Sequence, residues 1–229
     1  MFKKITLTAL AALLCIAAAT NVNAQTQSHS WSSKWSKETS SSWSSGPGGI
    51  QRSSQEKSHA SNSQTSLVRN ADGSLSQRRH SSNSIDNHRG ISESRGIHGV
   101  HQAGFNNTRI NSTNGVQTAV RGRNGMAVDT RVNSTTLTNN QGLSRGINSN
   151  GTTYLNQHNN TSLRNLQGHD VRAIGGGGGG ALHYQNIKRT GFDSNNARQA
   201  GFNGTGFYNN VQQSQNAFQN TDGFLRLFQ

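Results

Sequence analysis

A five-residue segment, Gln-Ala-Gly-Phe-Asn, occurs at residues 102–106 and again, unchanged, at residues 199–203. Weaker echoes surround it, because Arg-Gly-Ile occurs three times and Asn-Ser-Thr twice. Repeats built on Gln, Gly and Asn are typical of polar β-stacks, in which amide side chains pair along the stack, rather than of enzymes. The repeat therefore predicts degenerate stacking units.

The chain has little material for a hydrophobic core. Hydrophobic residues make up 29% of it and aromatic residues 6%. Burial on this scale struggles to offset the roughly 1–2 kcal/mol per residue of backbone entropy that is lost on folding. The chain is then either largely disordered as a monomer or ordered through dense backbone hydrogen bonding and stacked side-chain amides.

The first 24 residues have the pattern of a signal peptide. Lys3 and Lys4 precede a mostly apolar stretch, and Val22-Asn23-Ala24 matches the small-residue pattern that signal peptidases cut. The apolar stretch is shorter than the roughly 20 residues of a spanning helix, although an uncleaved anchor is the alternative. We expect a secreted, extracellular or cell-surface protein that begins at Gln25. Cleavage removes Cys15, the only cysteine.

Composition divides the rest of the chain into four regions. Residues 25–66 are Ser-rich with three interleaved Trp residues, and we expect them to be disordered. Residues 67–172 form a degenerate β-repeat region, and residues 173–180 a flexible glycine linker. Residues 181–229 are a C-terminal region rich in Gly-Phe, Asn and Gln. The predicted fold class is mostly β with large disordered parts.

Turn signals and alternation predict hairpins within the repeat region. Asn70-Ala71-Asp72-Gly73 predicts a hairpin turn, and the Asn-Gly pairs at residues 114–115, 124–125 and 150–151 predict further turns. Between these turns Val116, Thr118 and Val120 alternate with polar or small residues, as do Met126, Val128 and Val132. This period of two predicts half-buried strands. Their sparse aliphatic content suits a thin stacked coil.

No catalytic, cofactor or metal site is predicted. Residues 142–146 match the Gly-x-Ser-x-Gly string of a nucleophile elbow, but their polar flanks do not predict the required strand and helix. The glycine run at 175–180 matches a dinucleotide-binding string only trivially. His98 and His101 stand three residues apart without a nearby carboxylate, which favours solvated histidines over a weak metal site. We therefore expect a non-enzymatic protein with no small-molecule substrate.

The charge balance favours anionic partners. The net charge is +13, and removal of Lys3 and Lys4 from a segment that contains no acid leaves +11. Such a chain attracts extracellular DNA, acidic polysaccharide or an anionic membrane surface. Solubility through self-repulsion explains the same balance equally well.

At its repeats the sequence resembles the curlins, the secreted subunits of bacterial curli amyloid fibres. Curlin units contain Gln-x-Gly-x-x-Asn, which Gln102, Gly104 and Asn107 match; Gln199 and Gly201 match in the second copy. The resemblance extends loosely over residues 98–210. It implies strand-turn-strand rungs stacked as a β-solenoid, with Gln102, Asn107, Asn124 and Gln199 as ladder residues. Gly104 and Gly201 would permit the turn.

The resemblance favours a structural function. It implies a curlin-like subunit or accessory component of an extracellular amyloid-type matrix or adhesive fibre, one that self-associates and has dedicated secretion or nucleator partners. The alternative is a disordered cationic secreted protein that binds polyanions or surfaces, which includes silk, cement and defence-like proteins.

Overall fold

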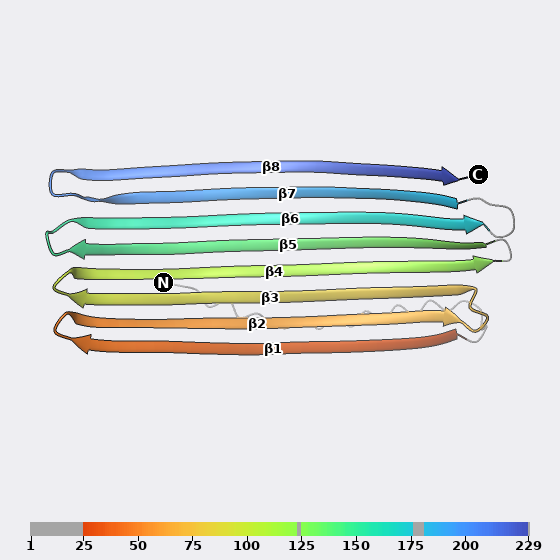
Figure 1. Cartoon of the computed structure of the whole chain (residues 1–229), viewed down its shortest axis with the longest axis horizontal. Helices are drawn as coiled ribbons and strands as arrows, with labels where there is room; N and C mark the ends of the chain where they lie inside the picture. The colour runs from red at the N-terminus through yellow and green to blue at the C-terminus, as the bar shows by residue number, and fades with distance from the viewer. Residues whose placement is uncertain (1–24, 123–124, 176–180, 229) are drawn as a thin grey trace.

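A computed structural model describes residues 25–122, 125–175 and 181–228, and these form one antiparallel sheet of eight strands (Figure 1). The strand order in space is the strand order in sequence, so the sheet is a simple meander. The strands are β1 (Gln25–Gly46), β2 (Gly49–Asn70), β3 (Leu75–Gly96), β4 (Gly99–Gly122), β5 (Gly125–Asn148), β6 (Thr153–Gly175), β7 (Ala181–Phe202) and β8 (Phe207–Phe228).

The prediction of a mostly β chain is confirmed, but the strands differ from those of a stacked coil. Each strand has 22 to 24 residues, or roughly 75 Å at about 3.4 Å per residue. Every strand pairs with its neighbour along its length. The described residues therefore form one long-stranded open sheet, in which hydrogen bonds between whole strands replace the expected short rungs.

The expectation of disorder for residues 25–66 is wrong, because these residues lie in β1 and β2. The serines pair across the strands: the hydroxyl groups of Ser32 and Ser63 lie 2.8 Å apart, as do those of Ser42 and Ser53. Paired hydroxyl groups and a full backbone ladder compensate for the missing apolar side chains. Of the predicted glycine linker, residues 173–175 belong to β6, and the rest lies outside the described residues, as does the predicted signal peptide.

The turns follow most of the sequence signals. Gly73 has a φ of 69° in the turn between β2 and β3, and its N–H donates to the carbonyl of Asn70 at 3.0 Å. Gly151, with a φ of 79°, occupies the turn between β5 and β6. The predicted turn at Asn114-Gly115 is wrong, because Gly115 lies inside β4 and pairs with His80 and Val132. A continuous ladder on both sides there prevails over the local turn preference.

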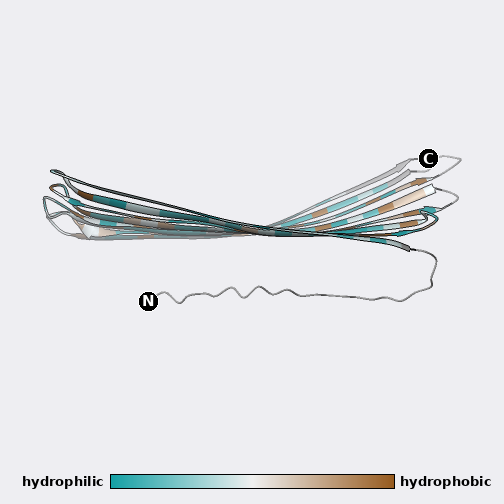
Figure 2. Cartoon of the chain, turned by 90° about the horizontal axis from the view of Figure 1, so that it is seen from below, coloured by the Kyte–Doolittle hydropathy of each residue, from teal (hydrophilic) through white to brown (hydrophobic). Residues whose placement is uncertain are grey.

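The sheet has two chemically different faces and no core. We define the apolar face by the odd-numbered residues of β1, β3, β5, β6 and β8 and the even-numbered residues of β2, β4 and β7, which the strand register places together. Fourteen of the well-exposed large hydrophobic side chains lie on this face and four on the other, the polar face. No hydrophobic side chain of the described residues is buried. Figure 2 shows that the sheet is a single twisted layer.

Aromatic rings cover several glycines on the polar face. A Cβ atom added to Gly90 would lie 2.5 Å from the ring of Phe105, and the rings of His158 and Phe218 occupy the same space above Gly142 and Gly191. These are cross-strand pairs of one glycine with one ring. A glycine leaves a gap in a strand that a neighbouring ring fills, and this pairing stabilises glycine-containing sheets.

Candidate self-association surfaces

The first candidate surface is the pair of open sheet edges. Strand β1 pairs only with β2, and β8 only with β7, so each edge presents one side of a 22-residue backbone. An unpaired edge is a template for another strand, and proteins that remain monomeric shorten or cover such edges. On β1 only Lys34, Lys37 and Glu38 carry charge. Neither edge is covered within the described part of the chain (Figure 1).

The second candidate surface is a row of apolar residues across the middle of all eight strands. One residue of each strand joins this central row on the apolar face: Trp35, Ala60, Ile85, Ile110, Leu137, Leu163, Phe192 and Ala217. Each of these residues is directly opposite the next in the register. Directly opposite side chains stabilise a sheet by roughly 0.2–1 kcal/mol per pair. The row is thus the only continuous apolar contact that spans the described sheet.

Amide and hydroxyl residues flank the central row symmetrically. In β4 the apolar-face residues are Asn106, Thr108, Ile110, Ser112 and Asn114, a pattern that reads almost the same in both directions. The other strands carry variants of this pattern, and we call the set the central belt: the apolar-face residues within 31–39, 56–64, 81–89, 106–114, 133–141, 159–167, 188–196 and 213–221. One margin of the belt is a row of amides: Asn106, Gln141, Asn159, Asn196 and Gln213.

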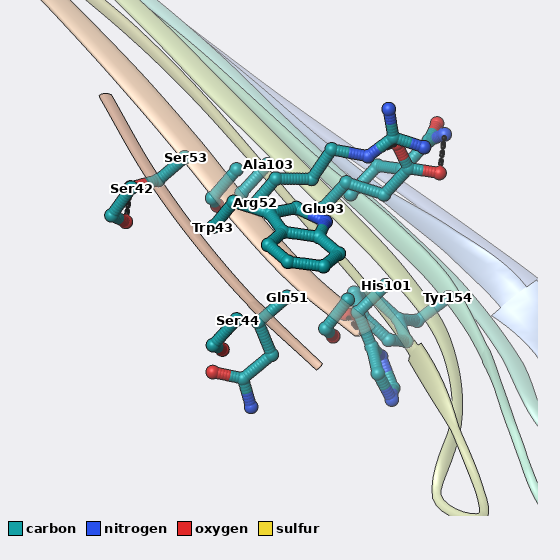
Figure 3. Close-up of a pocket in the computed structure, with 13 residues that line it drawn as sticks. Ser42, Trp43, Ser44, Gln51, Arg52, Ser53, Glu93, His101, Ala103 and Tyr154 are labelled. Carbon is teal, nitrogen blue, oxygen red and sulfur yellow. Dashed lines mark hydrogen bonds and ion pairs between the residues drawn. The ribbon is translucent and has the colours of Figure 1, made fainter. Parts of the chain in front are cut away.

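Most charged residues of the apolar face lie toward the ends of the strands, and several of them have polar partners there. Arg52 and Arg95 lie 3.4 Å and 2.7 Å from the carboxylate of Glu93, and Arg145 donates to the side-chain oxygen of Gln102 at 2.9 Å. Figure 3 shows Trp43, Arg52 and Glu93 on one side of the strands and His101 on the other. Nearer the middle, Glu56 accepts from Arg89 at 2.9 Å.

These pairs predict that acid loosens the sheet. The hydrogen bond from Arg89 and the neighbouring Lys37 lower the pKa of Glu56, and the hydrogen bond from Arg95 lowers the pKa of Glu93. A carboxylate with a lowered pKa contributes stability above its unfolded pKa, and that contribution is lost as the pH falls through the folded value. We therefore expect weaker amide-exchange protection of β2 and β3 below about pH 4 than at pH 7.

The variant Glu56→Gln provides the control for this pH effect. It removes the carboxylate but keeps the shape of the side chain, so β2 and β3 should lose part of their protection at pH 7 and respond less to acid. Equal protection of the original chain at pH 7 and pH 3, after correction for intrinsic exchange, would contradict the role of the pairs.

The structure separates the two copies of the repeated segment. Gln102 lies on the apolar face of β4, between Glu93 and Arg145, whereas Gln199 lies on the polar face of β7, between Asn156 and Asn210. Gln102 is therefore part of a charged row and not of an amide ladder. Gln199 does lie in an amide row. The copies are related in sequence but occupy opposite faces, because β4 and β7 both present even-numbered residues on the apolar face and the copies begin at an even and an odd position.

The remaining predicted repeat residues are divided in the same way. Asn107 lies in a row of four asparagines on the polar face, next to Asn140, Asn160 and Asn195. The expected turn role of Gly104 and Gly201 is wrong, because both lie within strands. Asn124 lies outside the described residues. The sequence reasoning missed the central row, whose members recur at intervals of 25 to 29 residues and would have revealed it.

The two strings with possible chemistry have ordinary surroundings. Ser144 lies inside β5, where Asn156 donates to its hydroxyl at 3.5 Å; it is not at the strand-to-helix turn that a nucleophile elbow requires. His101 contacts the Tyr154 hydroxyl at 3.0 Å. No group of three metal-binding side chains occurs within residues 25–122, 125–175 and 181–228. The same residues contain no helix that is long and apolar enough to cross a membrane.

Comparison with protein-family models, curated proteins and solved structures found no match to this chain.

Proposed function

We propose that this chain is a secreted, non-enzymatic structural subunit that adds to copies of itself edge to edge and so builds an extracellular matrix or adhesive fibre. The observation that carries the proposal is the combination of two open edges with the absence of any core in the described residues. A single-layer sheet exposes both faces to water and gains little from burial. Its main means of stabilisation is to extend its hydrogen-bond ladder to further chains.

The number of strands suits growth by simple translation. Because eight is even, β1 and β8 run in opposite directions (Figure 1). When β8 of one chain lies beside β1 of the next, the two strands are antiparallel and the meander continues across the junction. This head-to-tail contact does not close on itself, so it produces an open filament.

The faces of the sheet restrict the register of this junction. An antiparallel junction between translated copies keeps the apolar faces on the same side, so odd residues of β8 must lie opposite odd residues of β1. One register then places Ala217 opposite Trp35, which continues the central row from chain to chain. A shift by two residues would place Ala217 opposite Lys37 and interrupt the row. We therefore propose the first register.

Cysteine cross-linking tests both growth and register. In the proposed register Ser33 lies opposite Gln219, and in the shifted register it lies opposite Thr221. The secreted chain with Ser33→Cys and Gln219→Cys should form disulfide-linked multimers on assembly, and the chain with Ser33→Cys and Thr221→Cys should form few. Both pairs join opposite edges of the sheet, so neither can form within one chain. Multimers on non-reducing gels report the result.

The outcomes separate the function from the register. Thioflavin-T kinetics without lag-phase assembly, together with no fibre reflection at about 4.7–4.8 Å, would refute fibre formation. Fibres that cross-link only through the Thr221 pair would refute the register and leave the fibre function standing.

The resemblance to curlins supports the same proposal through a different geometry. Curlin rungs stack into a solenoid whose open end adds the next subunit, whereas this sheet would grow through its first and last strands. Amide rows along the growth direction are common to both. We propose a curlin-like role in a fibre, alone or with nucleator and secretion proteins, without the solenoid.

Binding of a polyanion is the second candidate function, because basic residues outnumber acidic ones on both faces. On the apolar face nine Arg and Lys residues accompany three acids. Extracellular DNA or acidic polysaccharide would then bind with an affinity that falls steeply with salt. Salt-sensitive binding by chains that never assemble would favour this candidate over the fibre.

A further inference from the structure

The central belt has no packing partner among the residues that the structure describes, although it has the composition of a buried surface. Trp35 is 70% exposed, Leu163 38% and Phe192 37%. The belt combines one apolar row and Trp31 with flanking Asn, Gln, Ser and Thr. Only four of its side chains are charged, namely Lys37, Glu56, Arg89 and Lys188. Short strand segments with aliphatic, amide and hydroxyl side chains and low net charge interdigitate in dry interfaces between sheets.

We infer that the central belt is the interface for a second copy of this chain, packed face to face, so that the fibre has two layers. The inference rests on the proposed fibre function but concerns a different surface, because edge-to-edge growth leaves the apolar face exposed. The partner is a second copy because the belt is complementary to itself.

The self-complementarity follows from the symmetry of the rows. Ten residues along each strand from the central row lies a second, interrupted apolar row. It contains Ile50, Val100, Ile147, Phe202 and Phe207, and Ser45, Arg95 and Thr153 occupy its other places. Ten residues in the other direction lies a third, which contains Leu75, Val120, Ala127 and Ala173. A two-fold axis in the plane of the sheet, along the strands or along the central row, places apolar rows of one copy on apolar rows of the other. Amide and hydroxyl residues predominate on both sides of the central row, so the flanking rows also meet rows of like composition under the same rotations.

The twist of the sheet selects the middle of the strands as the contact. Figure 2, which views the sheet edge-on, shows the sheet flat near the middle of the strands and twisted out of that plane toward both ends. Two such sheets approach most closely over the middle and separate toward the ends. The belt spans nine residues of eight strands, or roughly 1,200 Å² of each sheet at about 3.4 Å per residue and 4.8 Å per strand. This exceeds the roughly 800 Å² per partner of a standard stable interface.

The charges of the apolar face lie where they oppose this packing least. Within the belt, Lys37 and Arg89 both contact Glu56, at 3.2 Å and 2.9 Å. Lys188 lies at one margin of the belt, opposite Gln167 and Thr221. The basic residues of the face outside the belt, among them Arg52, Arg131 and Arg198, lie toward the strand ends. There the twisted sheets diverge and the guanidinium groups stay in water, where salt screens their repulsion.

Two matched double variants test the second layer. Ile110→Asp with Leu163→Asp places two charges in the central row, in two strands separated by β5. Val132→Asp with Ile187→Asp places the same charges on the polar face, in two strands separated by β6. Mass per length, measured by scanning transmission electron microscopy, counts the layers directly.

The expected mass per length differs twofold between the variants. Eight strands occupy about 38 Å of fibre. Fibres of the original chain and of the polar-face variant should contain two chains in that length, and fibres of the belt variant one. One chain per 38 Å in the original fibre, or the same value for both variants, would overturn the inference while the fibre function remains.

Tryptophan accessibility keeps the inference testable if the belt variant forms no fibre. A chain that retains only Trp35 (W31F/W43F) reports on the belt. A chain that retains only Trp43 (W31F/W35F) reports on the region outside it. Acrylamide quenching of Trp35 should fall several-fold on assembly and that of Trp43 should fall less. Equal quenching of Trp35 before and after assembly would overturn the inference. Shielding of Trp35 by anionic vesicles but not by assembly would do the same, since the belt would then face a lipid surface.

Discussion

Removal of β8 is expected to slow fibre growth at least about tenfold, because a sheet of seven strands has edges that run in the same direction. A chain that ends at Phe202 presents β7 instead of β8. Translated copies would then meet in parallel, so that neither the antiparallel ladder nor the central row continues. The elongation rate of seeded thioflavin-T reactions measures the effect.

Removal of β7 and β8 together provides the control for this truncation. A chain that ends at Gly175 has six strands, and its last strand runs opposite to β1. Leu163 would then occupy the place of Ala217 next to Trp35, on the same face. We expect this shorter chain to elongate faster than the seven-stranded chain. If growth instead falls steadily with each strand removed, strand direction does not control the junction.

The substitution Gly125→Ala is expected to destabilise the sheet by about 1–3 kcal/mol. Gly125 opens β5 with a φ of 138°, and an added Cβ atom would collide with the carbonyl oxygen of Ile174 in β6. An L-residue is strained at this φ, and the opposing backbone cannot move without losing its ladder. The midpoint of guanidinium unfolding, followed by far-UV circular dichroism, should fall.

Gly122 is the matched control because it flanks the same turn. An added Cβ atom there meets nothing within 4 Å. Gly122→Ala should therefore leave the midpoint within about 0.5 kcal/mol of the original chain, as surface substitutions usually do. Equal loss in the two variants would show that the turn itself needs both glycines and that the Ile174 carbonyl does not decide the effect.

Local chemistry made part of the fold predictable. The Asp-Gly signal placed the turn after β2, where the Ser74 N–H donates to the side chain of Asp72 at 2.9 Å. The Asn150-Gly151 signal placed the turn after β5 in the same way. Glycine adopts a positive φ at little cost, so local residues place these turns wherever no continuous ladder competes with them.

The central row was not predictable from a search for repeats. Adjacent strands of a meander run in opposite directions. Paired residues are therefore close in sequence near the turn that joins the two strands and far apart in sequence at the other end. Only residues at the middle of each strand recur at a nearly constant interval, as Ile85 and Ile110 do. A search for direct repeats therefore found Gln-Ala-Gly-Phe-Asn, whose two copies are not equivalent in the sheet.

That the chain is β-rich, basic and without enough apolar residues for a core follows from its residues alone, because propensity, charge and composition are local or additive properties. Which side chains share a face follows only from the pairing of the strands. Val116 and Val120 lie on the apolar face and Val128 and Val132 on the polar face, although both pairs alternate alike in sequence. The pairing of Gly122 with Gly125 sets this register, and a shift of one residue would exchange the faces. The face on which each residue lies therefore depends on long-range strand pairing. The surfaces through which we propose that the chain assembles depend on the same pairing.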